Sequence, residues 1–298
     1  MQDVNTEKHI VLFHRGCMDG ICSAAIVRKF LGKEANITFI PSMYGDGVNE
    51  KSLDSNTTLW IVDFSVPPLS LIVALDTGCK VIWIDHHESM HRIADDFKHQ
   101  NLTIIFDSHR SSSWLCWETL FPSAHKPKAV VHIDDRDMWK FKFELTRAFG
   151  EGMFNYVHAP DDKIMQDLLN CDDLLFQEMV LRGQTLLESK DRRIDRAINR
   201  GYFGYIRGIR CFYVNTGEDT SEVGERVYMS NIEPLVVVIY QYIDDGKIKF
   251  SLRSNTINVR EIAEKYGGGG HDFAAGFTLE IENEAVNKRL HNHERYVK

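Results

Sequence analysis

The sequence predicts an α/β domain built on a parallel sheet, followed by a smaller α+β domain. In the first half of the chain, five short runs rich in β-branched residues alternate with segments of helical periodicity, and such alternation is typical of a parallel sheet. The runs are continuously apolar, as expected of strands buried on both faces. Further along, two strand-like runs meet at Asp245-Gly246, a dipeptide typical of a β-hairpin.

Each element of the first domain is marked by its own pattern. Residues 20–31 place apolar side chains at helical spacing. Residues 67–77 begin with two prolines, which favour the first turn of a helix, and residues 111–121 begin with serines that suit an N-cap. These helices alternate with the expected strands, which are residues 9–13, 37–40, 58–62, 80–84 and 102–106.

The second half of the chain changes character twice. Residues 161–200 are charged, lack proline and carry apolar residues at helical spacing, so we expect helices that end in a connector. Residues 234–253 contain the two hairpin strands, and residues 257–266 form a short helix before four glycines. We therefore expect a first domain with a helical extension, a connector and a C-terminal domain, over residues 1–185, 186–205 and 206–298.

Composition limits the class of protein. Hydrophobic residues make up 43% and charged residues 26% of the 298 residues, as in ordinary globular proteins. Thirty-five basic against 43 acidic residues give a net charge of −8, which argues against coating a long nucleic-acid duplex. We find neither an apolar run near the roughly 18–20 residues that span a bilayer nor the pattern of a signal peptide. Six scattered cysteines without a C-x-x-C pair indicate reduced thiols in a cytoplasmic protein.

Acidic and histidine residues follow several of the predicted strands. The carboxyl ends of parallel strands meet at one edge of a sheet, where functional groups gather. We therefore expect these side chains to converge. They are His14, Cys17 and Asp19 after the first strand, Asp63 after the third, Asp85, His86 and His87 after the fourth, Asp107 after the fifth, and Asp134 to Asp137 after the apolar segment AVVHI.

Taken singly, each of these residues has a simpler explanation, as a helix cap, a core histidine or part of a solvated turn. Together, several buried carboxylates repel one another unless they are paired or bound to metal. Arg15, Arg110 and Arg136 could pair some of them, but divalent cations would neutralise the cluster better. Carboxylate oxygens mixed with imidazole nitrogens suit Mn²⁺ or a similar ion. The residues alone therefore favour a metal-dependent hydrolase.

Seven segments in order along the chain resemble the DHH phosphoesterase superfamily and its DHH-associated C-terminal domain. They are FHRGCMDGICSAA (13–25), IVDFS (61–65), IDHHES (84–89), FDSHRSSSWLCWETLF (106–121), IDDRDMW (133–139), SLRS (251–254) and GGGGHDFAAGF (267–277). That superfamily includes manganese-dependent single-strand exonucleases, nanoRNases, cyclic dinucleotide phosphodiesterases and inorganic pyrophosphatases. The glycine-rich second domain resembles the nuclease and phosphodiesterase branch.

The resemblance implies a role for each matching residue. His87 would lie near the scissile phosphate, and Asp85 would orient a neighbouring histidine. Asp63 would act in catalysis by bridging to a second ion, for which His14 is also a ligand. One or two Mn²⁺ ions are the implied cofactor, with Mg²⁺ or another divalent metal as the alternative. The complete first metal site would consist of Asp19, Asp63, His86 and Asp135.

The first motif departs from the family pattern at Cys17, where the usual motif has an aspartate. A thiolate could bind metal, but it is softer and would favour Zn²⁺ or Fe²⁺ over Mn²⁺. Alternatively, Cys17 only packs, and His14 shifts to compensate. We expect a weaker second metal site, not an absent one.

The second domain carries residues suited to binding the substrate. Arg253 ends a predicted strand and offers a bidentate fork for phosphate. Glycines 267–270 allow backbone N–H groups to approach a phosphate or base closely, and His271 adds a donor. No Gly-Lys-Ser/Thr follows, which disfavours an ATPase. The expected substrate-binding residues are Arg110, Arg253, Gly268, Gly269, Gly270 and His271.

We therefore expect a metal-dependent phosphodiesterase that hydrolyses short single-stranded oligonucleotides or strand ends to mononucleotides. The alternatives are a cyclic dinucleotide phosphodiesterase, a 3′,5′-bisphosphonucleotide phosphatase and, in another class, a non-catalytic nucleotide-binding sensor. The expected partner is a short nucleic acid or nucleotide, and no membrane. The helical segment 161–200 packs either within the chain or against a second copy in a homodimer.

Overall fold

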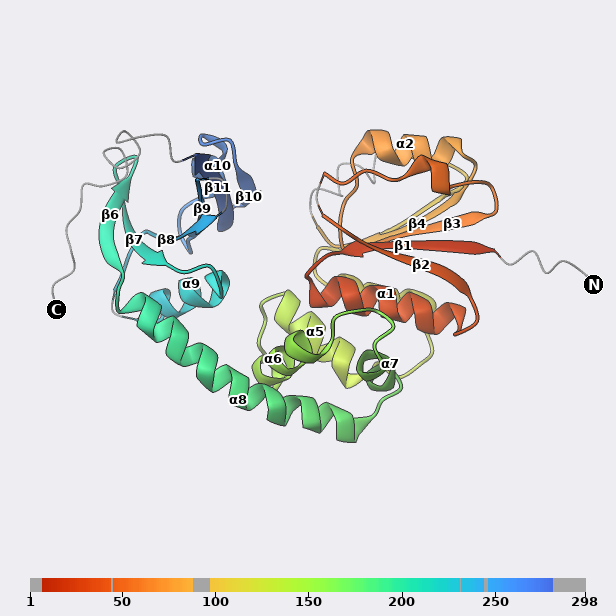
Figure 1. Ribbon diagram of the computed structural model, residues 1–298, viewed down its shortest axis with the longest axis horizontal. Coiled ribbons are helices and arrows are strands. Elements are labelled where there is room, and N and C mark those ends of the chain that lie inside the picture. Colours follow the sequence, from red (N-terminus) through yellow and green to blue (C-terminus); the bar gives the residue numbers. More distant parts are fainter. Residues whose placement is uncertain (1–6, 44, 88–96, 231, 244–245, 281–298) are drawn as a thin grey trace, which may run out of the picture. The chain divides into compact units, whose positions relative to one another are not determined.

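The computed structural model describes residues 7–43, 45–87, 97–230, 232–243 and 246–280 (Figure 1). The chain divides into two compact units, Met1–Leu187 and Glu188–Lys298. Helix α8, Asp173–Ile198, begins in the first unit and ends in the second. Glu88 and Ser89 of the expected Asp-His-His motif, and Asp245 of the expected hairpin turn, lie outside the described residues.

The first unit is built on a five-stranded parallel sheet, which confirms the predicted fold class. The strand order is β2-β1-β3-β4-β5, and each neighbouring pair is parallel. Val62 of β3 aligns with Phe13 of β1 and with Ile84 of β4, so the chain leaves these three strands at the same level. The strands are β1 (Lys8–His14), β2 (Asn36–Ser42), β3 (Thr57–Val62), β4 (Lys80–Asp85) and β5 (Leu102–Phe106).

Helices cover both faces of this sheet, which explains why its central strands are continuously apolar. Figure 1 shows α1 and α2 on opposite sides of the strands. Ile61 belongs to the core on the α2 side, whereas its neighbours Trp60 and Val62 belong to the core on the α1 side, because successive strand residues point to opposite faces. The helices are α1 (Met18–Leu31), α2 (Pro68–Asp76) and α4 (Ser112–Leu120), with a short 3₁₀ helix at Glu50–Ser52.

Further helices pack on the α1 side of the sheet. The apolar segment AVVHI and the acids that follow it form α5 (Lys128–Asp137), which begins after Pro127. The later helices are α6 (Thr146–Tyr156), α7 (Lys163–Leu169) and α8. Helices α6 and α8 touch through glycine, because a Cβ atom on Gly183 would lie 1.7 Å from the carbonyl oxygen of Ala148.

The second unit is built on a mixed six-stranded sheet of order β10-β11-β9-β8-β7-β6, in which only β7 and β8 pair in parallel. The predicted hairpin is present as β8 and β9, and the predicted short helix as α10. This arrangement confirms the α+β class. The elements are β6 (Tyr202–Ile206), β7 (Ile209–Asn215), α9 (Thr220–Tyr228), β8 (Val236–Ile243), β9 (Lys247–Arg253), α10 (Arg260–Glu264), β10 (Gly269–His271) and β11 (Ala274–Glu280).

The cysteines form no disulfide. All six are free thiols, as their spacing predicts. Within the ranges that the structure describes, no helix is both long and apolar enough to cross a membrane.

Candidate metal centre

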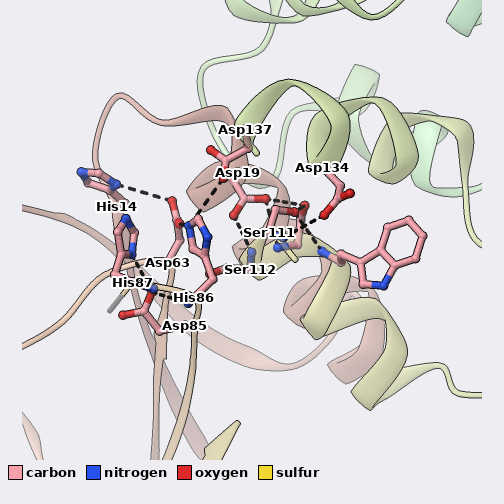
Figure 2. Close-up of polar contacts among 12 residues, drawn as sticks. His14, Asp19, Asp63, Asp85, His86, His87, Ser111, Ser112, Asp134 and Asp137 are labelled. Carbon is pink, nitrogen blue, oxygen red and sulfur yellow. Dashed lines mark hydrogen bonds and ion pairs between the residues drawn. The ribbon is translucent and has the colours of Figure 1, made fainter. Parts of the chain in front are cut away.

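Three neighbouring strands of the first sheet deliver histidine and carboxylate side chains to one point (Figure 2). His14 is the last residue of β1, Asp63 follows β3 directly, and β4 ends in Asp85 before His86 and His87. Because β1, β3 and β4 are adjacent and leave the sheet at the same level, these side chains converge. The structure therefore brings together the histidines and the acid that the sequence places at strand ends.

Asp63 lies at the centre of this cluster and is almost fully buried. Its backbone has a φ of 64°, in the left-handed region that costs energy for a residue with a side chain. Neither carboxylate oxygen accepts a hydrogen bond. The nearest ring nitrogens are His86 Nε2, 3.3 Å from Oδ1, and His14 Nδ1, 3.5 Å from Oδ2. A buried carboxylate held in this way is costly unless a cation completes its contacts.

Asp85 holds the two histidines that follow it. Its Oδ1 accepts hydrogen bonds from the backbone N–H groups of His86 and His87, at 2.7 and 3.2 Å, and lies 2.7 Å from Nδ1 of the His87 ring. Its Oδ2 accepts a hydrogen bond from the Ser65 hydroxyl at 3.0 Å. Asp85 thus fixes the orientation of the His87 ring through Nδ1.

Asp19 reaches the cluster from the first turn of α1 and is held by the start of α4. Its carboxylate accepts hydrogen bonds from the backbone N–H groups of Ser112 and Ser113, at 2.7 and 3.0 Å, and from the Ser113 hydroxyl at 2.5 Å. Ser111 is the N-cap of α4, as its sequence predicts, and its hydroxyl accepts a hydrogen bond from the N–H of Trp114. Unpaired N–H groups at a helix start stabilise a carboxylate there.

The fourth acid of the cluster is Asp137. The family resemblance had instead implied Asp135. His86 Nε2 lies 3.5 Å from Oδ2 of Asp137, and this oxygen is buried without a hydrogen-bond donor. The carboxylate of Asp135 instead accepts hydrogen bonds from the N–H groups of Lys142 and Phe143, at 2.9 and 3.2 Å, and from the Thr146 hydroxyl at 2.6 Å. Residues two apart on a helix point in nearly opposite directions, so α5 directs only one of these two acids into the cluster.

The assembled side chains fit a divalent cation. Ligand atoms fall into three overlapping sets, and within each set all of them lie within 4.8 Å of one another. Buried carboxylate oxygens without donors, mixed with imidazole nitrogens, are the donors that a divalent transition metal prefers. Asp63 and His86 each belong to two sets. The sets are Asp63, Asp85, His86 and His87; His14, Cys17 and Asp63; and Asp19, His86 and Asp137.

Crowding of the acids shifts their protonation. Burial, reinforced by the charge of Asp63, raises the pKa of Asp19 to about 7. Burial and the charges of Asp19 and Asp63 raise the pKa of Asp137 well above its ordinary value. Burial alone would lower the pKa of His86, but contact with Asp63 and the charges of Asp137 and Asp19 raise it to about 10. The cluster therefore has an excess of negative charge that protons or a metal must neutralise.

Cys17 faces the same centre. Its sulfur belongs to the set with His14 and Asp63. Burial, with the charges of Asp63 and Asp137, raises the pKa of the thiol well above its ordinary value. The thiol is therefore neutral at physiological pH unless a cation draws off its proton.

Arg110 lies beside this centre, on the α4 side. Its guanidinium stacks over the ring of Trp114, 4.1 Å from the ring centroid, and one nitrogen is 3.6 Å from Oδ2 of Asp134. Asp134 also accepts a hydrogen bond from Lys140 at 3.0 Å and another from the N–H of Ser111 at 2.8 Å. Arg110 therefore has local partners in addition to any role toward substrate.

The other predicted substrate-binding residues belong to the second unit. Arg253 donates hydrogen bonds to the hydroxyls of Thr220 and Ser221, at 3.0 and 3.1 Å, and its Nε is buried without a partner. Burial lowers the pKa of its guanidinium. No carboxylate of the described residues forms an ion pair with it.

The last two glycines of the glycine run begin β10 at the edge of the second sheet. A Cβ atom at Gly268 would lie 2.0 Å from the carbonyl oxygen of Gly276, whereas one at Gly269 would meet nothing within 4 Å. Close packing on β11 thus accounts for Gly268 and Gly270 but not for Gly269. His271, at the end of β10, is exposed.

The sequence pattern places Asp137 in the converging group without assigning it to the metal site, and the role of two serines was missed; all three residues had a recognisable signal. Asp137 lies four residues after buried Ile133, on the stripe of α5 that faces the core. Serines 112 and 113 open a predicted helix, where free N–H groups attract a carboxylate. Which carboxylate they would hold depends on the tertiary fold.

Comparisons with known proteins agree with this architecture. Residues 210–297 match the DHHA1 domain family. The bifunctional oligoribonuclease and PAP phosphatase NrnA of Mycoplasma genitalium is 42% identical over 320 residues, covering 95% of this chain and 94% of that protein. Oligoribonuclease NrnB of Bacillus subtilis is 24% identical over 301 residues, covering 91% and 73%. The fold is similar to that of PggH, a pGpG-specific phosphodiesterase from Vibrio cholerae, with a TM-score of 0.52 and 17% identity over 94% and 96% of the two chains.

Proposed function

The chain belongs to the DHH family of phosphoesterases with a C-terminal DHHA1 domain, and we propose that it is a metal-dependent phosphodiesterase that hydrolyses short single-stranded oligonucleotides, or strand ends, to mononucleotides. The observation that carries this proposal is the buried Asp63 carboxylate, which lacks hydrogen-bond donors and is surrounded by His14, His86 and further acids. The mycoplasma and Bacillus relatives are both named oligoribonucleases. Soluble oligonucleotides match a protein whose net charge is −8, because a short substrate needs few phosphate contacts.

Asp19, Asp63, His86 and Asp137 would hold the first divalent ion, and His14 with Cys17 would add ligands for a second one. When bound, such ions neutralise phosphate charge and lower the pKa of a coordinated water. The mixture of oxygen and nitrogen donors favours Mn²⁺, with Mg²⁺ or another divalent metal as the alternative. The serines at the start of α4 keep the Asp19 carboxylate in place before any ion arrives.

His87 is the residue that we assign to the phosphate. The short contact between its Nδ1 and Asp85 fixes the ring and favours a proton on that nitrogen. The opposite nitrogen can then accept a proton or contact a phosphate oxygen. The His87 ring lies 4.4 Å from the ring of His86 and 6.1 Å from that of His14, measured between centroids. This places His87 beside the proposed metal ligands.

A second candidate is removal of a phosphate from 3′,5′-bisphosphonucleotides. The name of the mycoplasma relative, which includes PAP phosphatase, favours it. Both reactions use the same ligands, so one enzyme can perform both. In the second unit, Arg253 and the β10 glycines remain our candidates for substrate binding.

The test is hydrolysis of labelled RNA and DNA of two to ten nucleotides, with Mn²⁺, Mg²⁺, Zn²⁺ or chelator, beside a bisphosphonucleotide. We expect mononucleotide release that requires metal and is abolished by Asp63→Asn. Metal-dependent release of phosphate alone would support the second candidate. If neither product forms with any divalent metal, while nucleotides still bind, the protein is the non-catalytic sensor and the proposal fails.

A further inference from the structure

A pocket of about 560 Å³ lies in the first unit beside the metal centre. Its walls are the loop that follows β1, the end of β2, and the segment 154–160 at the end of α6. This volume lies within the 300–1,000 Å³ range of small-ligand pockets. All of its lining residues are in the first unit.

The pocket adjoins the metal ligands through one residue. Cys17 lines the pocket, and its sulfur also lies within 4.8 Å of the ligand atoms of His14 and Asp63. A group attached to a phosphate at the metal centre therefore has only the width of one side chain to cross before it enters the pocket. A nucleoside next to the scissile phosphate meets this condition.

The lining is aromatic and apolar. Phe13 and Phe39 form an edge-to-face pair with centroids 6.4 Å apart, and Pro41 continues the wall from β2. Phe154 also lines the pocket and is 57% exposed. Flat aromatic surfaces of this kind stack with nucleobases, largely independently of base identity.

The walls are fixed before any ligand arrives. Arg28 makes two hydrogen bonds to Asp161, at 2.7 and 3.2 Å, and lies 5.2 Å from the Phe39 ring centroid. The carboxylate of Asp162 accepts hydrogen bonds from the N–H groups of His158 and Ala159, at 2.6 and 3.0 Å. A rigid pocket loses little entropy on binding.

One basic side chain adds a positive charge to the pocket lining. Arg15 lines it, is exposed, and pairs with no carboxylate of the described residues. Its backbone N–H is tied to the carbonyl of Ser42 at 2.9 Å, which holds the loop against β2. In a protein of net charge −8, an unneutralised guanidinium beside a metal centre suits a phosphate of the same strand.

We propose that this pocket is a nucleobase subsite, in which Phe39 and Phe154 receive the base of a nucleotide adjoining the scissile phosphate and Arg15 contacts the strand's next phosphate. The inference rests on the proposed function, and it identifies the part of the first unit that selects nucleic acid from other phosphodiesters. Phe154 is a binding residue in this scheme and takes no part in the chemical step.

The test compares wild type, Phe154→Ala and the control Phe30→Ala, which truncates a ring that is 48% exposed and lies outside the pocket. Each is assayed on a dinucleotide and on its two analogues with one base removed. We expect Phe154→Ala to raise KM roughly tenfold for the intact dinucleotide with kcat within about twofold. The analogue that lacks the base in the pocket should give wild type and Phe154→Ala the same KM.

Equal losses on all three substrates would mean that Phe154 acts on the fold and would overturn the inference, as would an unchanged KM for the intact dinucleotide. A direct binding measurement separates this result from a failure of the proposed function. Calorimetric titration in chelator with adenosine 5′-monophosphate and with ribose 5-phosphate should show a wild-type preference for the nucleotide that Phe154→Ala loses and Phe30→Ala keeps. Absence of that preference refutes the subsite even if the enzyme is active.

Discussion

Substituting Asp137 and Asp135 separately by asparagine tests the assignment of the α5 acids. The two residues are two apart in the sequence but differ in surroundings. Asp137 offers a buried oxygen without a donor, 3.5 Å from His86, whereas Asp135 accepts three hydrogen bonds from its own chain. We therefore expect Asp137→Asn to impair metal binding and Asp135→Asn to impair stability.

The expected magnitudes follow from these contacts. Asn at position 135 offers one acceptor oxygen in place of two, so it loses at least one of the bonds from Lys142, Phe143 and Thr146. A hydrogen bond to a charged group contributes about 1.5–3 kcal/mol, so the free energy of unfolding should fall by about 2–4 kcal/mol. Changes around a metal ligand cost about 10–100-fold in metal affinity, and we expect at least this loss for Asp137→Asn. Without metal, Asp137→Asn should be more stable than wild type, because it removes one of the three mutually repelling carboxylates Asp19, Asp63 and Asp137.

Calorimetric metal titration and urea unfolding of the metal-free proteins measure both effects, and hydrolysis at saturating metal gives a third readout. Asp135→Asn should bind metal with wild-type stoichiometry as long as it is folded. If Asp135→Asn abolished metal binding while Asp137→Asn bound normally, our placement of α5 would be wrong. Asp134→Asn serves as a neighbouring control for metal binding, because that carboxylate contacts Arg110, Lys140 and Ser111 and no metal ligand.

Three other expectations follow from the same structure. Gly183→Ala should cost about 3 kcal/mol in urea unfolding, because its Cβ would lie 1.7 Å from the Ala148 carbonyl oxygen; exposed Gln184→Ala, its control, should be nearly neutral. Cys17→Asp should lower the ratio of Zn²⁺ to Mn²⁺ affinity in competition titrations, because a carboxylate is a harder ligand than a thiolate; an unchanged ratio would show that the sulfur only packs. Burial raises the pKa of Asp19 to about 7 and that of Asp137 well above its unfolded value, so the stabilising contribution of each protonated acid is complete only below about pH 4 and is lost as the pH rises through the raised pKa, which for Asp19 is about 7. A divalent cation replaces those protons, so the difference in Tm between metal-loaded and metal-free protein should grow from pH 5 to pH 8; a constant difference would contradict this reasoning.

The sheet and the strand-end residues were predictable because a parallel sheet imposes its own geometry. The five predicted runs each became a strand, with ends differing by at most two residues. Once β1, β3 and β4 are neighbours, residues that follow them directly must lie close together. The strand assignments and the family pattern were therefore sufficient to predict that His14, Asp63 and His86 lie close together.

The acids on helices were harder to place. In the segment IDDRD, Asp135 and Asp137 carry the same chemistry, and only the rotation of α5 about its axis decides which one faces the centre. That rotation is set by the packing of Ile133 and its neighbours against residues from α1, α4 and α6. The same limit applies to Asp19, whose serine partners lie more than 90 residues away. Short-range patterns cannot specify contacts of this range.

The Asp-Gly pair at the start of α1 explains how the centre accommodates a cysteine in its first motif. A Cβ atom on Gly20 would lie 2.6 Å from the carbonyl oxygen of His14, so the first turn of α1 packs directly on the end of β1. This backbone contact, together with the hydrogen bonds from α4 to Asp19, sets the positions of two ligands without any help from residue 17. We therefore expect Cys17 to affect only which ions the set of His14, Cys17 and Asp63 prefers, while the set of Asp19, His86 and Asp137 keeps its shape. Substituting Gly20 should consequently disturb both the set that contains His14 and the set that contains Asp19. Substituting Cys17 should affect only the set that contains His14.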